Sequence, residues 1–559
     1  MKKYTYKSIL VLLGISVLLS CENYLDENNI ADVSAGSYYT TSQGLEDAVK
    51  ATYGIIKEFY GTELGFSMNV FGTDTYTNGA DGSHKYLNWY NNQHNSSARY
   101  FRDTWRIMYR GINQANAVIN RAETIEDMDQ ATLNTRLAEV RFLRALYYFN
   151  LVRYYGDVHL SLEETEGVET EANRTSVQEV YGQAIIPDLE FAVSNLPATQ
   201  SEYGRATKAA AEFLFAKVHL TAPQGSAAQA ASLMTNVINN YGFSLLDDWS
   251  DLWDINNEEN SEVVWTIINS KQQVDEGLDR YGHRGHLYFL FEYDKRPGMT
   301  RDTENGRPWK RFRPTDHLLS LWDRTKDARY DKGYKHVWYA NKPVPGQQVG
   351  DTALYIPGPG VDRSGVNQDA KWTQAAKDAV IYQVYTTDEY NQVIFPSLNS
   401  IWCLSIQCTI FPSLNKWIDN TRPNRQHTQG QRDFILMRLA DAYLIRAEAN
   451  FKQGNAAQAA EDLNVVRRRG AWDGEEGAME ITAADVSIDF ILDERARELV
   501  GEGHRWFDLV RNNKLVERVK AHNLDAMDNI QSHHVLRPIP LDQIDRTEGD
   551  YPQNPGYTQ

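Results

Sequence analysis

Apolar residues recur three and four positions apart over long stretches of the chain, which is the spacing of one face of an α-helix. Between 137 and 155, one such stripe contains Val140, Leu143 and Tyr147, and a second stripe lies around the same helix. A helix that is apolar on two faces is expected to be buried between neighbours. Gly156 is the expected stop, because glycine commonly ends helices. The pattern therefore predicts a buried helix over 137–155.

The same periodicity predicts further helices, some of them in pairs. Residues 206–222 are rich in alanine, which allows another helix to approach closely, and 226–240 is the expected partner. The clearest pair covers 433–453 and 456–469, joined by a glycine turn. Small residues at the crossing and larger ones beside them are typical of a tetratricopeptide-type pair, although no regular period of about 34 residues is present. Another helix is predicted at 494–509.

Three long stretches between these helices are irregular. They cover about 62–100, 270–312 and 340–430 and are rich in Gly, Asn, Asp, Tyr and Trp. Loops of this length in a compact protein usually carry function or are disordered. Their aromatic content argues against simple disorder, so we expect them to contain the functional site.

A six-residue sequence, Ile-Phe-Pro-Ser-Leu-Asn, occurs twice in the last of these stretches, at 394–399 and at 410–415. A tandem duplication explains this repeat better than chance does. We therefore predict that 394–415 is an insertion that forms a surface loop, which folds poorly or packs over an edge. Deletion of 16 residues here should leave stability nearly unchanged. Cys403 and Cys408 lie inside it without metal-ligand spacing, and are compatible with one disulfide or with two free thiols.

The N-terminus has the features of an export signal. A basic segment precedes the apolar run Ile9–Leu19, which is too short to span a bilayer. The Leu-Leu-Ser-Cys sequence at 18–21 resembles a bacterial lipobox, so we predict a signal peptide at 1–20 and acylation of Cys21. An ordinary signal peptide followed by an incidental cysteine is the alternative. Residues 21–35 are polar and acidic, as expected of a flexible tether to a lipid anchor.

Charge narrows the classes of partner. The formal net charge is −18, and removal of the signal peptide makes it more negative. This argues against nucleic acid and anionic lipid head groups as partners. Neutral glycans are compatible with it, whereas a polyanionic glycan would require a local basic patch. The sequence has no Gly-x-Ser-x-Gly, His-Glu-x-x-His or phosphate-binding glycine motif, and we expect no cofactor and no metal site.

Several longer segments follow one another in a characteristic order over nearly the whole mature chain. They are AEVRFLRALYYFNLVRYYGDVHL (138–160), GRATKAAAEFLFAKVHLTA (204–222), RPTDHLLSLWDRTKDARYDKGY (313–334), ADAYLIRAEANFKQGN (440–455) and ILDERARELVGEGHRWFDLVR (491–511), followed by RPIP and PQNPGY. Together they resemble the RagB/SusD family of nutrient-uptake lipoproteins.

This resemblance implies a mainly α fold, with a tetratricopeptide-like helical scaffold and long irregular loops that form the ligand site. The body would cover 36–559, with an N-terminal region at about 36–225 and a C-terminal region at about 260–559. The resemblance also implies a place on the surface of a Bacteroidetes-type Gram-negative cell, anchored by lipid to the outer membrane. The implied partner is a SusC-like TonB-dependent transporter barrel, to which the protein would deliver captured oligosaccharide.

Candidate binding residues follow from the chemistry of sugars, which have apolar C–H faces and polar rims. Sites that bind them combine exposed aromatic rings with polar side chains on loops. The resemblance points to the same two regions, the loop after the first helix and the central block. The candidates are Asp74, Trp89, Tyr90 and Asn92 in the first region, and Tyr281, His283, Arg284, Tyr288 and Trp309 in the second.

Some of these residues have structural alternatives. Trp89 can instead pin its loop to the scaffold. Arg284 and Arg311 can meet carboxylates or sulfates of a charged glycan, but a solvated arginine is the more usual case. Trp105 and Trp506 lie in helical stretches and are predicted to be core.

Three glutamates invite a catalytic interpretation. Glu494, Glu498 and Glu502 repeat every four residues, and a glycosidase needs two carboxyl groups about 5–10 Å apart. The arginines around them favour structural ion pairs instead. We therefore predict glycan capture without catalysis. A surface glycoside hydrolase and a lipoprotein that captures peptides or glycopeptides are the alternatives.

Overall fold

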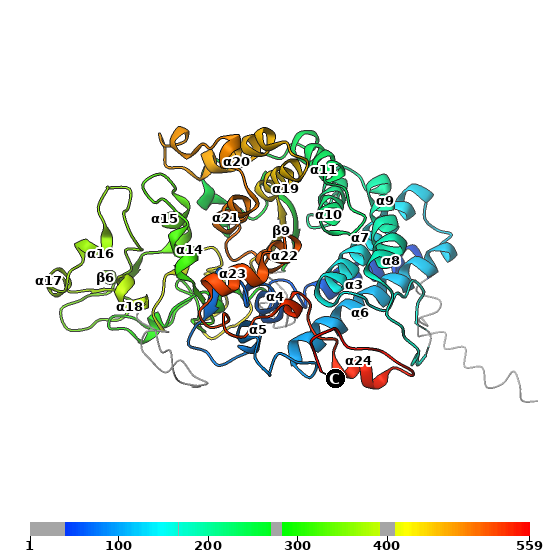
Figure 1. The fold of residues 1–559 in the computed structure, drawn as a ribbon, viewed down its shortest axis with the longest axis horizontal. Coiled ribbons are helices and arrows are strands. Elements are labelled where there is room, and N and C mark those ends of the chain that lie inside the picture. Colours follow the sequence, from blue (N-terminus) through cyan, green and yellow to red (C-terminus); the bar gives the residue numbers. More distant parts are fainter. Residues whose placement is uncertain (1–39, 166, 270–281, 392–408, 559) are drawn as a thin grey trace, which may run out of the picture.

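The computed structural model describes residues 40–165, 167–269, 282–391 and 409–558. Helices dominate it, which confirms the expected mainly α class (Figure 1). The N-terminal part supplies α3 (Ser42–Ile56), α4 (Glu63–Val70), α5 (Tyr86–Trp89), α6 (Arg99–Arg121), α7 (Gln130–Tyr155), α8 (Val177–Val180), α9 (Ile186–Asn195), α10 (Lys208–Thr221) and α11 (Ala227–Asn240).

The C-terminal part adds a second group of helices, of which α19 (Leu439–Lys452) and α20 (Ala456–Gly470) continue the scaffold beyond α11 (Figure 1). A smaller lobe at the other end of the molecule holds short helices and β6 (Figure 1). The remaining helices include α13 (Gly285–Tyr288), α14 (Asp316–Ser320), α15 (Arg329–Gly333), α16 (Gln368–Lys371), α17 (Gln374–Asp378), α18 (Thr387–Asn391), α21 (Ile488–Glu498), α22 (Arg505–Arg511), α23 (Leu515–His522) and α24 (Leu541–Arg546).

Helix α7 is the central element of the scaffold, as its two apolar stripes predict. The Asp129 carboxylate caps its start by accepting from the backbone N–H groups of Ala131 and Thr132, at 3.1 and 3.0 Å. Gly156, with φ +71°, ends it. Almost every side chain from Ala138 onward is buried. A helix buried on all sides gains most of its stability from packing rather than from amphipathicity.

Two of the predicted helices differ from the structure. Residues 434–438 form the strand β9 (Phe434–Arg438), which pairs antiparallel with β2 (Val263–Ile267). All five residues of β9 are buried, and a short apolar run of this kind cannot be told from a buried helix by periodicity alone. The helix predicted at 494–509 is two helices, α21 and α22, because Gly501 and Gly503 between them adopt φ of +76° and +83°.

Short strands join parts of the chain that are far apart in sequence. Strand β1 (Tyr76–Asn78) pairs antiparallel with β3 (Phe312–Pro314), which brings the two predicted loop regions together. In the smaller lobe, β5 (Val337–Tyr339), β6 (Thr352–Tyr355) and β7 (Gln383–Val384) form a three-stranded sheet.

The second copy of the repeated hexapeptide, at 410–415, does not form the surface loop that we predict from the sequence. Ile410, Phe411 and Leu414 are buried in the core. Strand β8 (Ser413–Leu414) pairs with β4 (Tyr334–Lys335). The hydrophobic residues of the motif make this copy a core segment, so the prediction was wrong for residues 410–415.

The three regularly spaced glutamates belong to a buried ion network, as predicted. Glu494, Glu498 and Glu502 are all fully buried. Arg329 donates to Glu494 at 2.8 Å and to Glu498 at 2.9 Å, and Arg438 bonds both Glu498 and Glu502. Most of the partners thus come from other segments rather than from the neighbouring arginines of the same helix.

Several predictions fall on residues outside the described ranges: the signal peptide, Cys21 and its tether, Tyr281, the first hexapeptide copy, and Cys403 with Cys408. Within the described ranges, no helix has both the length and the apolar character needed to cross a membrane.

Candidate functional site

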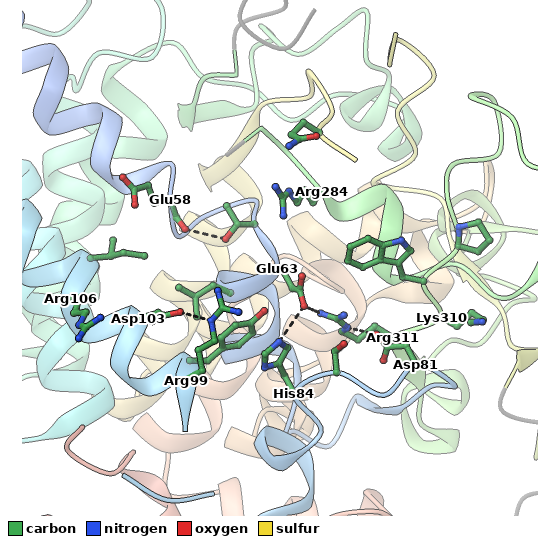
Figure 2. A pocket seen from close by; sticks show the side chains of 18 residues that line it. Glu58, Glu63, Asp81, His84, Arg99, Asp103, Arg106, Arg284, Lys310 and Arg311 are labelled. Carbon is green, nitrogen blue, oxygen red and sulfur yellow. Dashed lines mark hydrogen bonds and ion pairs between the residues drawn. The ribbon is translucent and has the colours of Figure 1, made fainter. Parts of the chain in front are cut away.

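A cleft of about 960 Å³ lies where the two loop regions meet. Helix α6 forms one wall, and the start of α4, the loop before α5 and the segment before β3 form the others (Figure 2). The lining residues are Glu58, Thr62, Glu63, Leu64, Asp81, Ser83, His84, Arg99, Tyr100, Asp103, Arg106, Ile107, Arg284, Pro308, Trp309, Lys310, Arg311 and Gln429.

Backbone contacts fix the two loops against each other. The N–H of Gly79 donates to the carbonyl oxygen of Arg311 at 2.8 Å. A Cβ at Gly79 would lie 2.0 Å from the carbonyl oxygen of Lys310, so this close approach requires glycine. Lys310 and His84 themselves adopt left-handed backbone with φ of +55° and +58°. Such conformations are uncommon for residues other than glycine and cluster at functional sites.

The wall from α6 presents alternating charges. Arg99, Asp103 and Arg106 follow one another at i, i+4 and i+7, so they share one face of the helix. The Arg99 guanidinium donates to Asp103 at 2.9 Å (Figure 2). The ring of Tyr100 stacks on His84, with centroids 3.6 Å apart and planes at 15°.

His84 is neutral at physiological pH. Burial lowers the pKa of His84 to about 4, even though the carboxylate of Glu63 lies only 3.5 Å from its ring nitrogen. The imidazole therefore offers this cleft an aromatic face and a neutral hydrogen-bonding edge rather than a charge.

Arg311 ties the base of the cleft together. Its guanidinium donates to Glu63 at 2.5 Å and to Asp81 at 2.7 Å, and Figure 2 shows Glu63 between Arg311 and His84. Burial alone would raise the pKa of Glu63, but Arg311 outweighs that effect and leaves the pKa below its ordinary value. The buried arginine thus keeps the carboxylate ionised and positions both loops.

Two of the predicted site residues line this cleft. Arg284 lies at its edge, and its backbone N–H donates to the carbonyl oxygen of Gly61 at 2.8 Å. Trp309 is half-buried, and its backbone N–H donates to the carbonyl oxygen of Leu287 at 2.7 Å. Its ring rests edge-on against Tyr288, with centroids 5.8 Å apart. Trp309 is therefore anchored by its backbone while part of the indole stays exposed.

Two predicted residues of the first loop are buried and do not reach the cleft. Asp74 is fully buried, and its carboxylate accepts from Arg505 at 2.6 and 2.7 Å and from Arg518 at 2.7 Å. Tyr90 is also buried, and its hydroxyl donates to the carbonyl oxygen of Gly72 at 2.8 Å. Both side chains have structural roles, because their polar atoms are satisfied inside the protein.

Two predicted residues of the second region are likewise core residues. His283 is fully buried against Phe66 and Trp417, with ring centroids 5.7 and 5.1 Å away. Burial lowers the pKa of His283 to about 3, so the ring is uncharged. Tyr288 is fully buried beneath Trp309 and supports it.

Trp89 and Asn92 lie outside the lining of the cleft. Trp89 is half-buried, and its carbonyl oxygen accepts from the side-chain amide of Asn529 at 3.0 Å. Asn92 is exposed, and its carbonyl oxygen accepts from Asn95 at 2.7 Å. The alternative that Trp89 pins its loop therefore fits its position better. Trp105 and Trp506 are buried core residues, as predicted.

Sequence reasoning missed the helical wall and the charged base of the cleft. Asp103 and Arg106 lie on α6, beyond the irregular stretch 62–100, and Arg99 and Tyr100 stand at the very end of that stretch, where α6 begins. The available signal was the polar face of this amphipathic helix, with charged side chains repeating every three or four residues.

The chemistry of the cleft suits binding. Its carboxylates are held in ion pairs, such as Glu58 with Arg110 at 2.5 Å and Asp81 with Lys85 at 3.0 Å. Within the described residues, no group of three or more His, Cys, Asp or Glu side chains is arranged to hold a metal ion.

The chain matches two known sequence profiles and several known proteins. The sequence profile described as "SusD family" matches residues 261–557, and a second profile, "Starch-binding associating with outer membrane", matches residues 23–220. A SusD-like protein of Formosa agariphila is 26% identical over 549 residues, which cover 94% of each chain. The starch-binding protein SusD of Bacteroides thetaiotaomicron is 26% identical over 80% of this chain and 76% of its own.

Solved structures show the same fold. A SusD homologue from Bacteroides thetaiotaomicron superposes with a TM-score of 0.71 at 21% identity, covering 94% of this chain and 99% of its own. A laminarin-binding SusD-like protein superposes with a TM-score of 0.67 at 24% identity, covering 92% of this chain and all of its own. The expected tetratricopeptide-like helical fold is thereby confirmed.

Proposed function

The chain belongs to the SusD family, and from that premise we propose that it captures oligo- or polysaccharide at the cell surface and releases it uncleaved. The observation that carries this proposal is the cleft of about 960 Å³, which combines a partly exposed indole with many hydrogen-bonding side chains. Clefts of this size and mixed character are typical of small-molecule sites.

The lining offers each kind of contact that a sugar requires. The exposed part of Trp309 can lie against the apolar face of a pyranose ring, and the Tyr100–His84 stack gives a second aromatic surface. Arginine and carboxylate groups around them can bond the hydroxyls. Because the carboxylates already serve as partners of cations, we propose binding without hydrolysis.

The location and the partner complete the proposal. We propose that Cys21 carries the lipid anchor, that the protein faces outward from the outer membrane, and that it delivers its glycan to a SusC-like TonB-dependent transporter. Proteins named for starch and laminarin binding, and the matching profile described as associating with the outer membrane, support this proposal.

The test is replacement of Trp309 by Ala in the mature protein, followed by affinity electrophoresis in gels that contain laminarin, starch or a uronan. Loss of roughly 80 Å² of ring contact at about 25 cal/mol per Å² removes about 2 kcal/mol, or about thirtyfold in affinity. Trp472→Ala is the matched control, because Trp472 is also half-buried but lies outside the cleft.

Two results would contradict the proposal. Unchanged retention of every glycan by Trp309→Ala would remove the cleft as the site. Release of reducing sugar by the purified wild-type protein would favour the glycoside-hydrolase alternative instead.

A further inference from the structure

The described lining of the cleft carries more positive than negative side chains, although the chain as a whole has a formal charge of −18. The positive side chains are Arg99, Arg106, Arg284, Lys310 and Arg311, and the carboxylates are Glu58, Glu63, Asp81 and Asp103. The cleft lining is thus net positive within an acidic protein, and it provides the basic patch that a negatively charged glycan would need.

Two positive side chains of the cleft are also more exposed than its carboxylates. The side chains of Arg99 and Arg106 are 68% and 49% exposed. Among the carboxylates, Asp103 is the most exposed at 25%, and Glu63 follows at 19%. An entering ligand therefore meets guanidinium groups first.

Two of the carboxylates also pair with arginines that lie outside the lining of the cleft. Glu58 pairs with Arg110 at 2.5 Å, and Asp103 lies 3.3 Å from Arg102 in addition to Arg99. Arg110 and Arg102 do not line the cleft. Glu58 and Asp103 thus each keep a cation of their own when a ligand enters.

The arginines at the mouth hold their present partners only weakly. Arg99 pairs with Asp103, and Arg106 pairs with Asp542, both at the protein surface. Exposed ion pairs of this kind contribute little to stability, so a ligand anion can replace the partner at little cost. Arginine binds carboxylate and sulfate groups with two parallel hydrogen bonds, which suits both anions equally.

We propose that the cleft selects an anionic oligosaccharide, whose carboxylate or sulfate groups bind the guanidiniums of Arg99 and Arg106 while a sugar ring lies against Trp309. This inference rests on the proposed function, since it names the class of glycan that the same cleft takes. Arg284, at the opposite edge, faces the same space (Figure 2).

The experiment measures affinity by titration calorimetry on the mature protein at low and at moderate salt. The probes are an oligogalacturonate, a sulfated carrageenan oligosaccharide and a neutral laminarin oligosaccharide of equal length. We expect at least one anionic probe to bind at least about tenfold more tightly than the neutral one, with affinity that falls as salt rises. Whether the uronate or the sulfated probe binds identifies the anion.

The variant Arg99→Gln/Arg106→Gln should lose at least about tenfold in affinity for the anionic probe and most of its salt dependence. Arg468→Gln is the matched control, because Arg468 is also an exposed arginine in a surface ion pair, but on α20. Its affinity should equal that of the wild type. Equal melting temperatures of the variants exclude misfolding as the cause.

The outcomes separate the inference from the proposed function. If the neutral probe binds as tightly as both anionic ones, or if the double variant binds the anionic probe unchanged while Trp309→Ala loses it, the inference is overturned and glycan capture stands. If none of the three probes binds, glycan capture itself fails, and the inference fails with it.

Discussion

Glu498 lies at the centre of the buried ion network, and replacing it by glutamine tests what holds the C-terminal helices to the rest of the protein. Its carboxylate accepts from Arg438 at 2.7 Å, from Arg469 at 2.5 Å and from Arg329 at 2.9 Å. Glutamine keeps the shape of the side chain. It removes the charge, and it places an amide N–H₂ where a second acceptor is needed.

The expected loss follows from this geometry. Burial would raise the pKa of Glu498, but Arg469, Arg438 and Arg329 outweigh burial and hold the pKa well below its ordinary value, so the carboxylate is ionised at neutral pH. Removing one partner from a buried ion pair typically costs about 3–5 kcal/mol. The total stability of a domain is about 5–15 kcal/mol, so a large fraction would be lost.

The assay is urea unfolding followed by fluorescence, with Glu480→Gln as the matched control. Glu480 also pairs with an arginine, Arg468, but the two side chains are 46% and 43% exposed. An exposed pair of this kind should contribute less than about 1 kcal/mol. If Glu498→Gln lowered the free energy of unfolding no more than Glu480→Gln does, the network would not be desolvated as the structure indicates.

Three further predictions concern the stability of the protein in acid, the close backbone approach at Gly79 and the lipid anchor at Cys21. The pKa values of Glu494 and Glu498 in the folded protein lie below the unfolded value of about 4.3, so the stability that their ionised forms contribute is complete above that pH and is lost as the pH falls toward the folded-state pKa. The urea midpoint should therefore drop steeply below about pH 4. A midpoint that stays constant there would contradict this prediction. Gly79→Ala should weaken glycan retention in affinity gels, because its Cβ would lie 2.0 Å from a carbonyl oxygen, whereas Gly182→Ala, with no neighbour closer than 3.8 Å, should retain glycan like the wild type. Cys21→Ala should move the protein from the membrane fraction to the soluble fraction of the cell, and a variant that stayed in the membrane fraction would refute the lipid anchor.

Much of the helical scaffold could be predicted from sequence because its helices are long and their apolar residues are dense. Helix α7 is the clearest case, since side chains on all of its faces are buried. The strand β9 and the break between α21 and α22 were missed for a local reason. A buried five-residue strand has no period to recognise, and the role of Gly501 becomes visible only through its positive φ.

The candidate site was predicted less completely than the scaffold. Trp309 and Arg284 could be found because they combine the right chemistry with a loop position. Asp74 has the same appearance in the sequence, yet it is buried by partners that lie 431 and 444 positions further along the chain. The local sequence cannot distinguish a polar residue that binds a ligand from one that forms an ion pair with an arginine far away in the chain.

The contacts of Asp74 also have a consequence for how the protein is made. During synthesis, this carboxylate leaves the ribosome long before Arg505 and Arg518 exist, and enclosing it without a cation would be costly. Burial of Asp74 in the early part of the core is therefore favoured only once nearly the whole polypeptide is available. For the exported protein that we propose, this delay would be an advantage, because a nascent polypeptide that stays unfolded can still be threaded through a translocation channel.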